Sequence, residues 1–180
     1  LTRRREEEEL GELVEAFDTT AADLVAARGG RLIKTLGDEV LYAADDAGTA
    51  AEIALRLIET MANDETMPEL RVGMAFGTVT TRMGDVFGTT VNLASRLTSI
   101  APRDAVLVDA DFAHELIRTG DAPASEAAAA EAAAAAEKEG EEPPTYRFAL
   151  QPMWQRPVRG LGVVEPWLLT RRTPPEASSD

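Results

Sequence analysis

The first part of the chain repeats apolar side chains at the spacing of an α-helix. Residues 5–28 carry one such stripe, and the glycine pair Gly29-Gly30 that follows is a typical helix stop. A second stripe, with Ile53 and Ile58 among its members, runs from about residue 46 to residue 62. Further helices are predicted from Thr89 to about residue 100 and over residues 111–117.

Short runs with β-forming residues separate these helices. Residues 31–35 and 39–43 flank Leu36-Gly37-Asp38, which predicts a hairpin. Residues 70–77 alternate in polarity, and the small residues on one side, Gly73 among them, would let another backbone approach closely. Four more strands are expected, at residues 79–82, 105–108, 145–150 and 163–169.

This order of elements predicts an α+β fold in which helices lie on one face of a mostly antiparallel sheet. The regular pattern fills residues 1–118 and breaks at Gly120. Residues 119–144 are rich in alanine and glutamate, which predicts an exposed helical or disordered insertion. Residues 145–172 then supply the last strands of the same domain, and residues 173–180 read as a disordered tail.

Composition narrows the function. A length of 180 residues suits one domain, and the absence of cysteine excludes disulfides and thiolate metal sites. The net charge of −14 disfavours binding to nucleic acid or anionic lipid, so an anionic ligand needs locally collected cations or bound metal. No apolar run is long enough to span a membrane. We expect a soluble domain, and its abrupt start in a helix suggests a piece of a longer protein.

The segment from Gly84 to Arg96 concentrates chemically useful groups. Two glycines bracket a loop that carries Asp85, and the predicted helix behind it places Asn92, Arg96 and Ser99 on one face. An amide, a guanidinium and a hydroxyl near a helix start favour an anionic ligand. A solvated surface helix behind an ordinary loop would show the same pattern.

Four other charged residues are candidates for binding a ligand. Lys34, in an otherwise apolar strand, either donates to a small ligand or reaches from a strand edge to water. Asp38 is either a turn residue or a carboxylate ligand for Mg²⁺. Arg71 and Arg159 would ordinarily be surface charges, although the glycines after Arg159 could bring its cation close to a phosphate.

Three motifs together resemble the catalytic domain of class III nucleotidyl cyclases. They are Ile-Lys-Thr-Leu-Gly-Asp at 33–38, Leu-Arg-Val-Gly at 70–73 and Asp-Val-Phe-Gly-Thr-Thr-Val-Asn-Leu-Ala-Ser-Arg at 85–96. The similarity covers most of residues 3–118 and resumes at 157–169. It implies a ferredoxin-like cyclase fold and a head-to-tail homodimer whose active sites are shared across the interface.

The resemblance also implies a role for each matching residue. Lys34 and Asp85 correspond to the pair that reads adenine, and Asn92 and Arg96 to the pair that stabilises the transition state. Asp38 corresponds to one of two metal aspartates, with two Mg²⁺ or Mn²⁺ ions expected. Arg159 corresponds to the triphosphate cation, and Arg71 is a further substrate-binding candidate. The other metal aspartate and its strand precede the first helix in the family pattern, and residues 1–3 do not supply them.

The chemistry of these side chains agrees with the implied roles. A lysine can donate to a ring nitrogen of adenine, and an aspartate can accept from its exocyclic amine. His114, the single histidine, is assigned to packing or to the surface.

The sequence thus predicts an adenylate cyclase catalytic domain that converts ATP to cyclic AMP and pyrophosphate, in the cytoplasm or as the cytosolic part of a larger protein with room for regulatory domains upstream. The alternative is a noncatalytic nucleotide-binding or dimerisation module, in effect a sensor. An acidic interaction scaffold ranks last, because it leaves the polar motifs unexplained.

Overall fold

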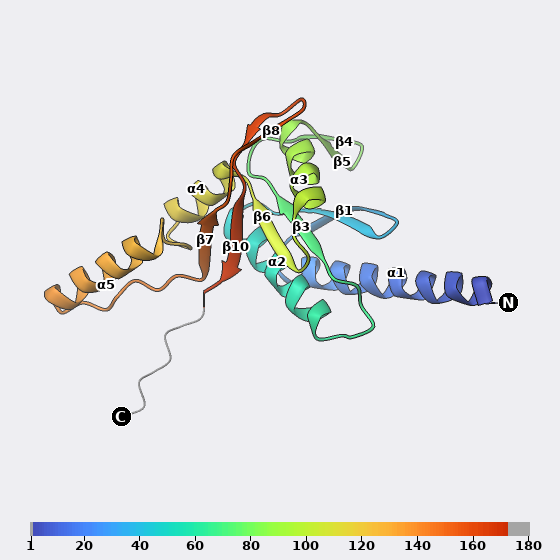
Figure 1. Cartoon of the computed structure of the whole chain (residues 1–180), viewed down its shortest axis with the longest axis horizontal. Helices are drawn as coiled ribbons and strands as arrows, with labels where there is room; N and C mark the ends of the chain where they lie inside the picture. The colour runs from blue at the N-terminus through green and yellow to red at the C-terminus, as the bar shows by residue number, and fades with distance from the viewer. Residues whose placement is uncertain (1, 173–180) are drawn as a thin grey trace.

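The computed structural model describes residues 2–172, and two of its helices pack against each other along one side. Helix α1 covers Thr2–Ala27 and helix α2 covers Ala47–Ala62. The C-terminal half of α1 buries Phe17 and Val25 against Ile53 and Leu57 of α2. The other half of α1 projects from the domain and is exposed (Figure 1). Both helices agree with the predicted ranges, although α1 starts earlier than residue 5.

The hairpin predicted between these helices is present. Strand β1 (Arg31–Leu36) pairs antiparallel with β2 (Glu39–Ala43), and Leu36 faces Glu39 across a two-residue turn. Gly37 occupies the first turn position with φ of 61°, a conformation that glycine adopts without strain. The pairing register shifts between Leu32 and Lys34, which marks an irregularity in β1. Within the described residues, the hairpin forms a two-stranded sheet of its own.

The main sheet has four strands in the order β3-β6-β10-β7. They are β3 (Arg71–Met74), β6 (Ala105–Val108), β10 (Trp167–Arg171) and β7 (Phe148–Pro152). Only the β3–β6 pair is parallel, so the sheet is mostly antiparallel as predicted. Strand β7 begins three residues later than the sequence pattern indicated.

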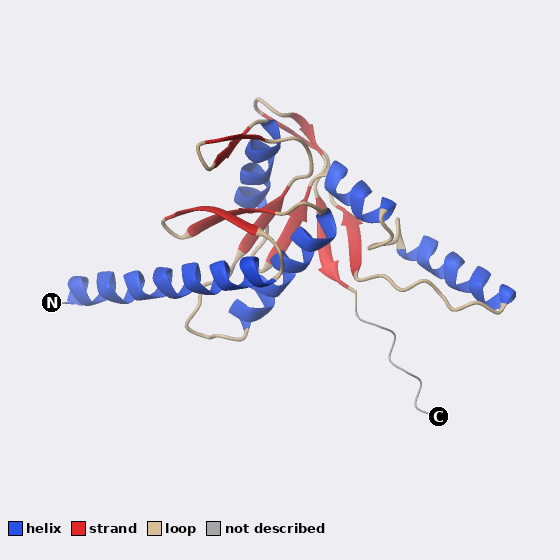
Figure 2. Cartoon of the chain, turned by 180° about the vertical axis from the view of Figure 1, so that it is seen from behind, coloured by secondary structure: helices blue, strands red, loops and turns tan. Residues whose placement is uncertain are grey.

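Helices cover both faces of this sheet (Figure 2), so the prediction that they lie on one face is wrong. On one face, α2 and α4 (Ala110–Arg118) pack against Val106, Val108 and Leu169. On the other face, α3 (Thr89–Ile100) packs against Leu107 through Leu97, which is fully buried. Alternate residues of β6 therefore enter two separate apolar clusters.

Two small hairpins flank α3. Strand β4 (Thr80–Arg82) pairs with β5 (Asp85–Phe87), and β8 (Arg156–Val158) pairs with β9 (Gly162–Val164). The prediction of one strand over residues 163–169 is wrong. Pro166 lies between β9 and β10, and its carbonyl accepts a hydrogen bond from the Met153 amide at 2.9 Å. The chain therefore leaves the small hairpin at this point and enters the main sheet.

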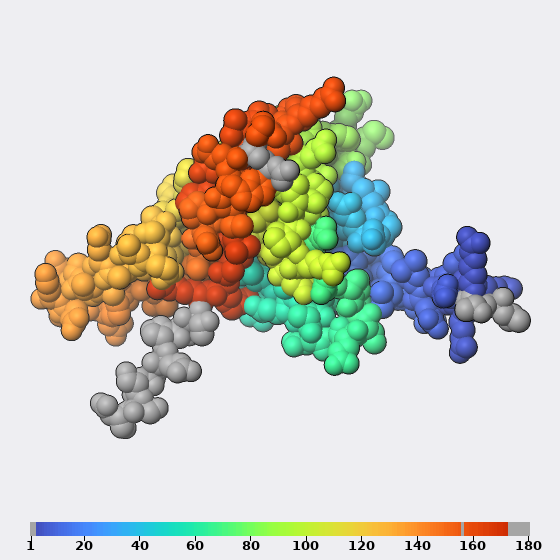
Figure 3. All heavy atoms as spheres, viewed as in Figure 1, coloured from blue at the N-terminus to red at the C-terminus, as the bar shows by residue number. Residues whose placement is uncertain are grey.

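The alanine-rich insertion contains helix α5 (Glu126–Glu139), which has Ser125 as its N-cap and Gly140 as its C-cap. It extends away from the sheet as an arm (Figures 1 and 3). Both ends of the arm meet at Asp121, whose carbonyl accepts hydrogen bonds from the amides of Arg147 and Phe148. The predicted tail, residues 173–180, lies outside the described residues. None of the helices in the described part of the chain is long and apolar enough to cross a bilayer.

Candidate active site

Lys34 and Asp85 are 51 positions apart in sequence and form an ion pair. The Lys34 ammonium, on β1, lies 2.9 Å from Oδ2 of Asp85, at the start of β5. The other carboxylate oxygen of Asp85 accepts a hydrogen bond from the Val86 amide at 2.8 Å. The hydrogen bond from Lys34, followed by that from the Val86 amide, lowers the pKa of Asp85. A hydrogen-bond donor and a charged acceptor thus stand side by side, both open to solvent in part.

Helix α3 presents its polar stripe outward. Asn92, Arg96 and Ser99 are all exposed, and Ser99 donates a hydrogen bond to the Arg96 carbonyl at 2.7 Å. The opposite side of the helix lies directly on β3, because Gly73 has no side chain. A Cβ at Gly73 would lie 2.5 Å from the carbonyl oxygen of Ala94 and closer still to the amide nitrogen of Thr98. The close backbone approach predicted for this strand is confirmed.

Arg96 shares a hollow with Arg159. The hollow has a volume of about 230 Å³ and lies between the last turns of α3 and the β8–β9 hairpin, which carries Arg159 in its turn. Ser99, Pro157 and Val158 are among the other lining residues, and the described lining contains no carboxylate. Guanidinium groups bind phosphate oxygens through several hydrogen bonds at once. The hollow therefore suits an anion, in a chain whose net charge is strongly negative.

Asp38 and Arg71 are the other two predicted site residues. Asp38 is exposed in the turn of the β1–β2 hairpin, and Arg71 is exposed at the start of β3. Among residues 2–172, no hydrogen bond or ion pair links either side chain to Lys34, Asp85 or Arg96. The described residues also contain no group of three acidic or histidine side chains placed to hold a metal. An exposed carboxylate such as that of Asp38 fits Mg²⁺ as a single ligand, because phosphates and water supply the others.

A buried carboxylate, Asp109, was not singled out by the sequence reading. It is 7% exposed, and one of its oxygens accepts hydrogen bonds from the amides of Phe76, at 3.1 Å, and Phe112, at 3.0 Å. Burial raises the pKa of Asp109, against the effect of these hydrogen bonds. The signal was available, because an aspartate between a strand and a helix three residues ahead of Phe112 is a typical N-cap.

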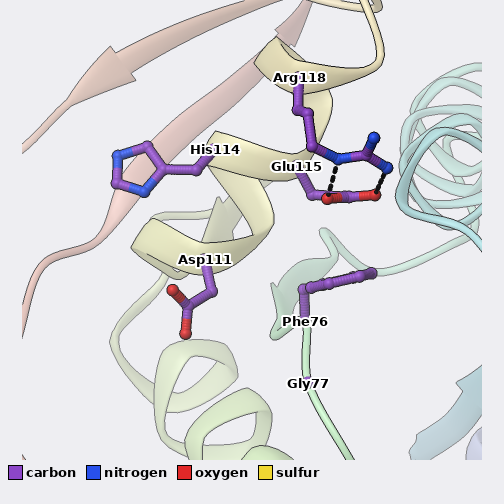
Figure 4. Close-up of a pocket in the computed structure, with 6 residues that line it drawn as sticks. All are labelled: Phe76, Gly77, Asp111, His114, Glu115 and Arg118. Atoms are coloured by element: carbon purple, nitrogen blue, oxygen red, sulfur yellow. Dashed lines mark hydrogen bonds and ion pairs between the residues drawn. The ribbon is translucent and has the colours of Figure 1, made fainter.

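A second hollow, of about 370 Å³, lies between α4 and the segment at Phe76 and Gly77 (Figure 4). Glu115 and Arg118 form an ion pair above Phe76, with a nitrogen to oxygen distance of 2.6 Å. His114 points the other way and meets the Trp167 ring edge-on, with 6.1 Å between ring centroids. The residues that line this hollow include none of the candidate site residues.

Comparison with known proteins identifies the family. The family model described as the adenylate and guanylate cyclase catalytic domain matches residues 2–134. An adenylate cyclase of Streptomyces coelicolor is 91% identical over 172 residues, which are 96% of this chain and 45% of that protein. An adenylate cyclase of Streptomyces griseus is 78% identical over 185 residues, 96% of this chain and 46% of that protein. The chain thus spans less than half the length of these relatives.

Solved structures show the same fold. The catalytic core of a rhodopsin-guanylyl cyclase with converted specificity, in complex with ATPαS, superposes with a TM-score of 0.70 at 20% identity. That match covers 92% of this chain and 85% of the other. The adenylyl cyclase CyaB from P. aeruginosa superposes with a TM-score of 0.65 at 17% identity, covering 96% of this chain and 89% of the other. The chain belongs to the adenylate and guanylate cyclase catalytic domain family.

Proposed function

We propose that this domain is the catalytic part of an adenylate cyclase, which converts ATP to 3′,5′-cyclic AMP and pyrophosphate. In that reaction a bond forms between the ribose 3′-oxygen and the α-phosphorus, the bond from the α-phosphorus to pyrophosphate breaks, and the 3′-hydroxyl loses its proton. The observation that carries the choice of ATP is the Lys34–Asp85 pair. The names of the two Streptomyces relatives agree with it.

The polarity of this pair matches adenine. The Lys34 ammonium can donate to a ring nitrogen of the base, and the Asp85 carboxylate can accept from the exocyclic amine. Guanine carries a carbonyl where adenine has the amine, so Asp85 would face an acceptor. A site that leaves a polar group without a hydrogen-bond partner rejects that substrate strongly, so this pair would favour ATP over GTP. The lowered pKa of Asp85 keeps the carboxylate ionised and therefore accepting at neutral pH.

The exposed face of α3 would act on the sugar and the phosphates. Arg96 and Arg159 line one hollow that contains no carboxylate in its described lining, which supports binding of the polyphosphate there. We assign Arg159 to the triphosphate, and Arg96 to the charge that develops on the α-phosphoryl group during transfer. Asn92, one turn before Arg96 on the same face, would hold the ribose in line for attack. Arg71 is assigned to substrate binding on the resemblance alone.

A divalent cation, Mg²⁺ or Mn²⁺, would be held in part by Asp38. When bound, such ions activate the attacking oxygen and neutralise phosphate charge. The family pattern calls for two ions and a second aspartate ahead of α1, so metal binding is best tested in the full-length protein. We assign the activity to the cytoplasm, where ATP and Mg²⁺ are supplied.

A homodimer would combine these groups. Within the described residues, no hydrogen bond or ion pair joins Asp38 to Asn92 or Arg96, which supports a site completed by a second copy. Large apolar side chains are also exposed on the two hairpins nearby: Leu36 is 57% exposed, Phe87 is 51% exposed and Met83 is 96% exposed. A second copy bound at these hairpins would cover these exposed apolar side chains.

Complementation tests this proposal. In the full-length protein, Asp38→Ala and Asn92→Ala should each abolish cyclic AMP formation, and a mixture of the two should recover part of it. Recovery is expected because half of the sites in a mixed dimer would combine two intact contributions. Activity that never exceeds the sum of the separate variants would contradict the shared site. A folded wild-type protein that binds ATP with metal and forms no cyclic AMP would contradict the enzyme and favour the nucleotide sensor.

A further inference from the structure

Helix α3 lacks the side-chain cap that starts the other capped helices. Helices α2, α4 and α5 begin at Asp46, Asp109 and Ser125, and each of these side chains accepts a hydrogen bond from the first turn. Helix α3 begins at Gly88, which has φ of 126° and makes no such bond. The start of the helix that carries Asn92 and Arg96 is therefore fixed in another way.

The fixing contact is a hydrogen bond from Thr90 to another part of the chain. The Thr90 hydroxyl donates to the carbonyl oxygen of Thr78 at 2.9 Å. Gly77 lies against the same hydroxyl, because a Cβ at this position would come within 2.7 Å of Thr90 Oγ1. The first turn of α3 thus packs closely against segment 76–78. A side chain at position 77 would prevent this contact, and Gly77 has none.

The segment 76–78 is itself held in place, although it belongs to no strand. The Asp109 amide donates to the Met74 carbonyl at 3.1 Å, and the buried Asp109 carboxylate accepts from the Phe76 amide. These two bonds fix the chain on the near side of Gly77. A hydrogen bond to Thr78 therefore links the start of α3 to a fixed point near the sheet.

Thr90 and Asn92 face different directions. Two residues along an α-helix correspond to a rotation of about 200°. This agrees with Thr90 being half-buried against segment 76–78 while Asn92 is exposed. The Thr90 hydroxyl is therefore directed at the backbone of segment 76–78, away from the face that carries Asn92.

We infer that Thr90 is a positioning residue, whose hydroxyl fixes the first turn of α3 on segment 76–78 and so sets the place of Asn92. The inference rests on the proposed function, in which Asn92 orients the ribose. Loss of the hydroxyl lets the first turn move, which reduces the fraction of bound ATP that is aligned for attack. Transition-state alignment then suffers more than ATP binding.

The test compares two threonines of the same helix. Thr90→Val removes the hydroxyl and keeps the shape, and Thr90→Ser keeps a hydroxyl. Thr98→Val is the matched control, because Thr98 is also half-buried but donates to Ala94 within α3. In the full-length protein, Thr90→Val should lower kcat about three- to tenfold and change KM for ATP by less than about twofold. Thr90→Ser should restore most of kcat, and Thr98→Val should retain it.

Amide hydrogen exchange supplies a readout that does not need activity. Exchange in the first turn of α3 should accelerate in Thr90→Val and stay unchanged in Thr98→Val. If Thr90→Val fails to fold, Gly77→Ala serves instead, because its Cβ would push against the Thr90 hydroxyl.

If the wild-type protein is active, a folded Thr90→Val variant that keeps the wild-type kcat overturns the inference. A Thr98→Val variant that loses as much kcat as Thr90→Val overturns it too. Unchanged exchange in the first turn overturns it as well. A wild-type protein that forms no cyclic AMP contradicts the proposed function instead, and the exchange experiment then still decides whether Thr90 fixes the helix.

Discussion

Replacing Gly73 with alanine should displace helix α3. The added Cβ would meet three backbone atoms of α3, at 2.5 Å from the Ala94 carbonyl oxygen and 2.6 Å from the Leu97 carbonyl carbon, with the Thr98 amide nitrogen closest. None of these atoms belongs to a flexible side chain that could turn away. Since nonbonded carbon contacts are comfortable at about 3.5 Å and beyond, the helix must move by about 1 Å.

The size of the effect follows from that displacement. Overpacking of a well-packed contact typically costs about 1–3 kcal/mol. In a domain of this size, such a cost lowers Tm by about 2–12 °C. Because α3 carries Asn92 and Arg96, a shift of about 1 Å should also lower kcat/KM for ATP by up to about 100-fold. Thermal unfolding and a cyclic AMP assay on the full-length protein measure the two effects.

Gly11→Ala is the matched control, since it makes the same chemical change in open space. No atom lies within 4 Å of a Cβ built at Gly11, which is exposed in the middle of α1. Alanine there should stabilise the helix by about 0.5–1 kcal/mol and leave activity unchanged. Equal Tm values for the Gly73→Ala and wild-type proteins would refute the contact between β3 and α3 as described.

Three further predictions concern charged groups. Lys34→Glu combined with Asp85→Lys reverses the polarity of the base-reading pair, so the ratio of kcat/KM for ATP to that for GTP should fall at least about tenfold. Asp109→Asn keeps an oxygen that can accept both amide hydrogen bonds, whereas Asp109→Ala does not. Because burial raises the pKa of Asp109, the wild-type protein loses stability as pH rises through the folded pKa and the carboxyl ionises. The stability of Asp109→Asn relative to wild type, measured by urea unfolding, should therefore increase from about pH 4 to pH 7. Asp109→Ala should be less stable than Asp109→Asn at every pH. Arg171, at the end of β10, bonds to Glu52 and Glu59 of α2, so Arg171→Met should destabilise the domain by about 0.5–1 kcal/mol after solvent screening.

The Arg171 effect has a defined pH dependence. Burial raises the pKa of Glu52, and hydrogen bonds from Arg171 and Arg56 outweigh this and lower it. A lowered carboxyl pKa stabilises the fold above the unfolded value, and that contribution is lost as pH falls through the folded value. The stability difference between Arg171→Met and wild type should therefore vanish in acid. A stability difference that persists in acid would contradict the ion pair as the cause of the Arg171→Met effect. For the Lys34→Glu, Asp85→Lys double variant, an unchanged ratio of kcat/KM for ATP to that for GTP would contradict recognition of the base by these two residues.

Local patterns in the sequence predict most of the individual elements. Periodicity located α2 and α3, and the turn chemistry of Gly37 located the β1–β2 hairpin, because both depend on neighbouring residues. The strand predicted over residues 163–169 failed at Pro166 for the converse reason. A strand joins a hairpin or a sheet through pairing partners that lie far away in the chain. The local alternation of side chains does not identify these partners.

The candidate site divides in the same way. The chemistry and spacing of the side chains predicted Lys34, Asp85, Asn92 and Arg96 as candidates, and the family resemblance suggested their roles. The 2.9 Å contact of Lys34 with Asp85 depends on how β1 and β5 meet, which no local pattern specifies. Thr90 was passed over because its hydroxyl acts on the Thr78 carbonyl, and backbone acceptors are the same for every sequence. The roles of these four residues, like those of Asp38, Arg71 and Arg159, remain predictions.

The closed base of the arm gives the domain a place where its length can change. Because the amides of Arg147 and Phe148 bond to the carbonyl of Asp121, the chain leaves the domain and returns to it at one point. The entropy of closing a loop grows only slowly with its length, so evolution could extend or shorten the arm with little effect on the sheet. Gly140, exposed at the far end of α5, would accept an inserted reporter domain on the same grounds. The arm is thus a suitable insertion point for a reporter domain, because the insertion would leave the core of the cyclase domain unchanged.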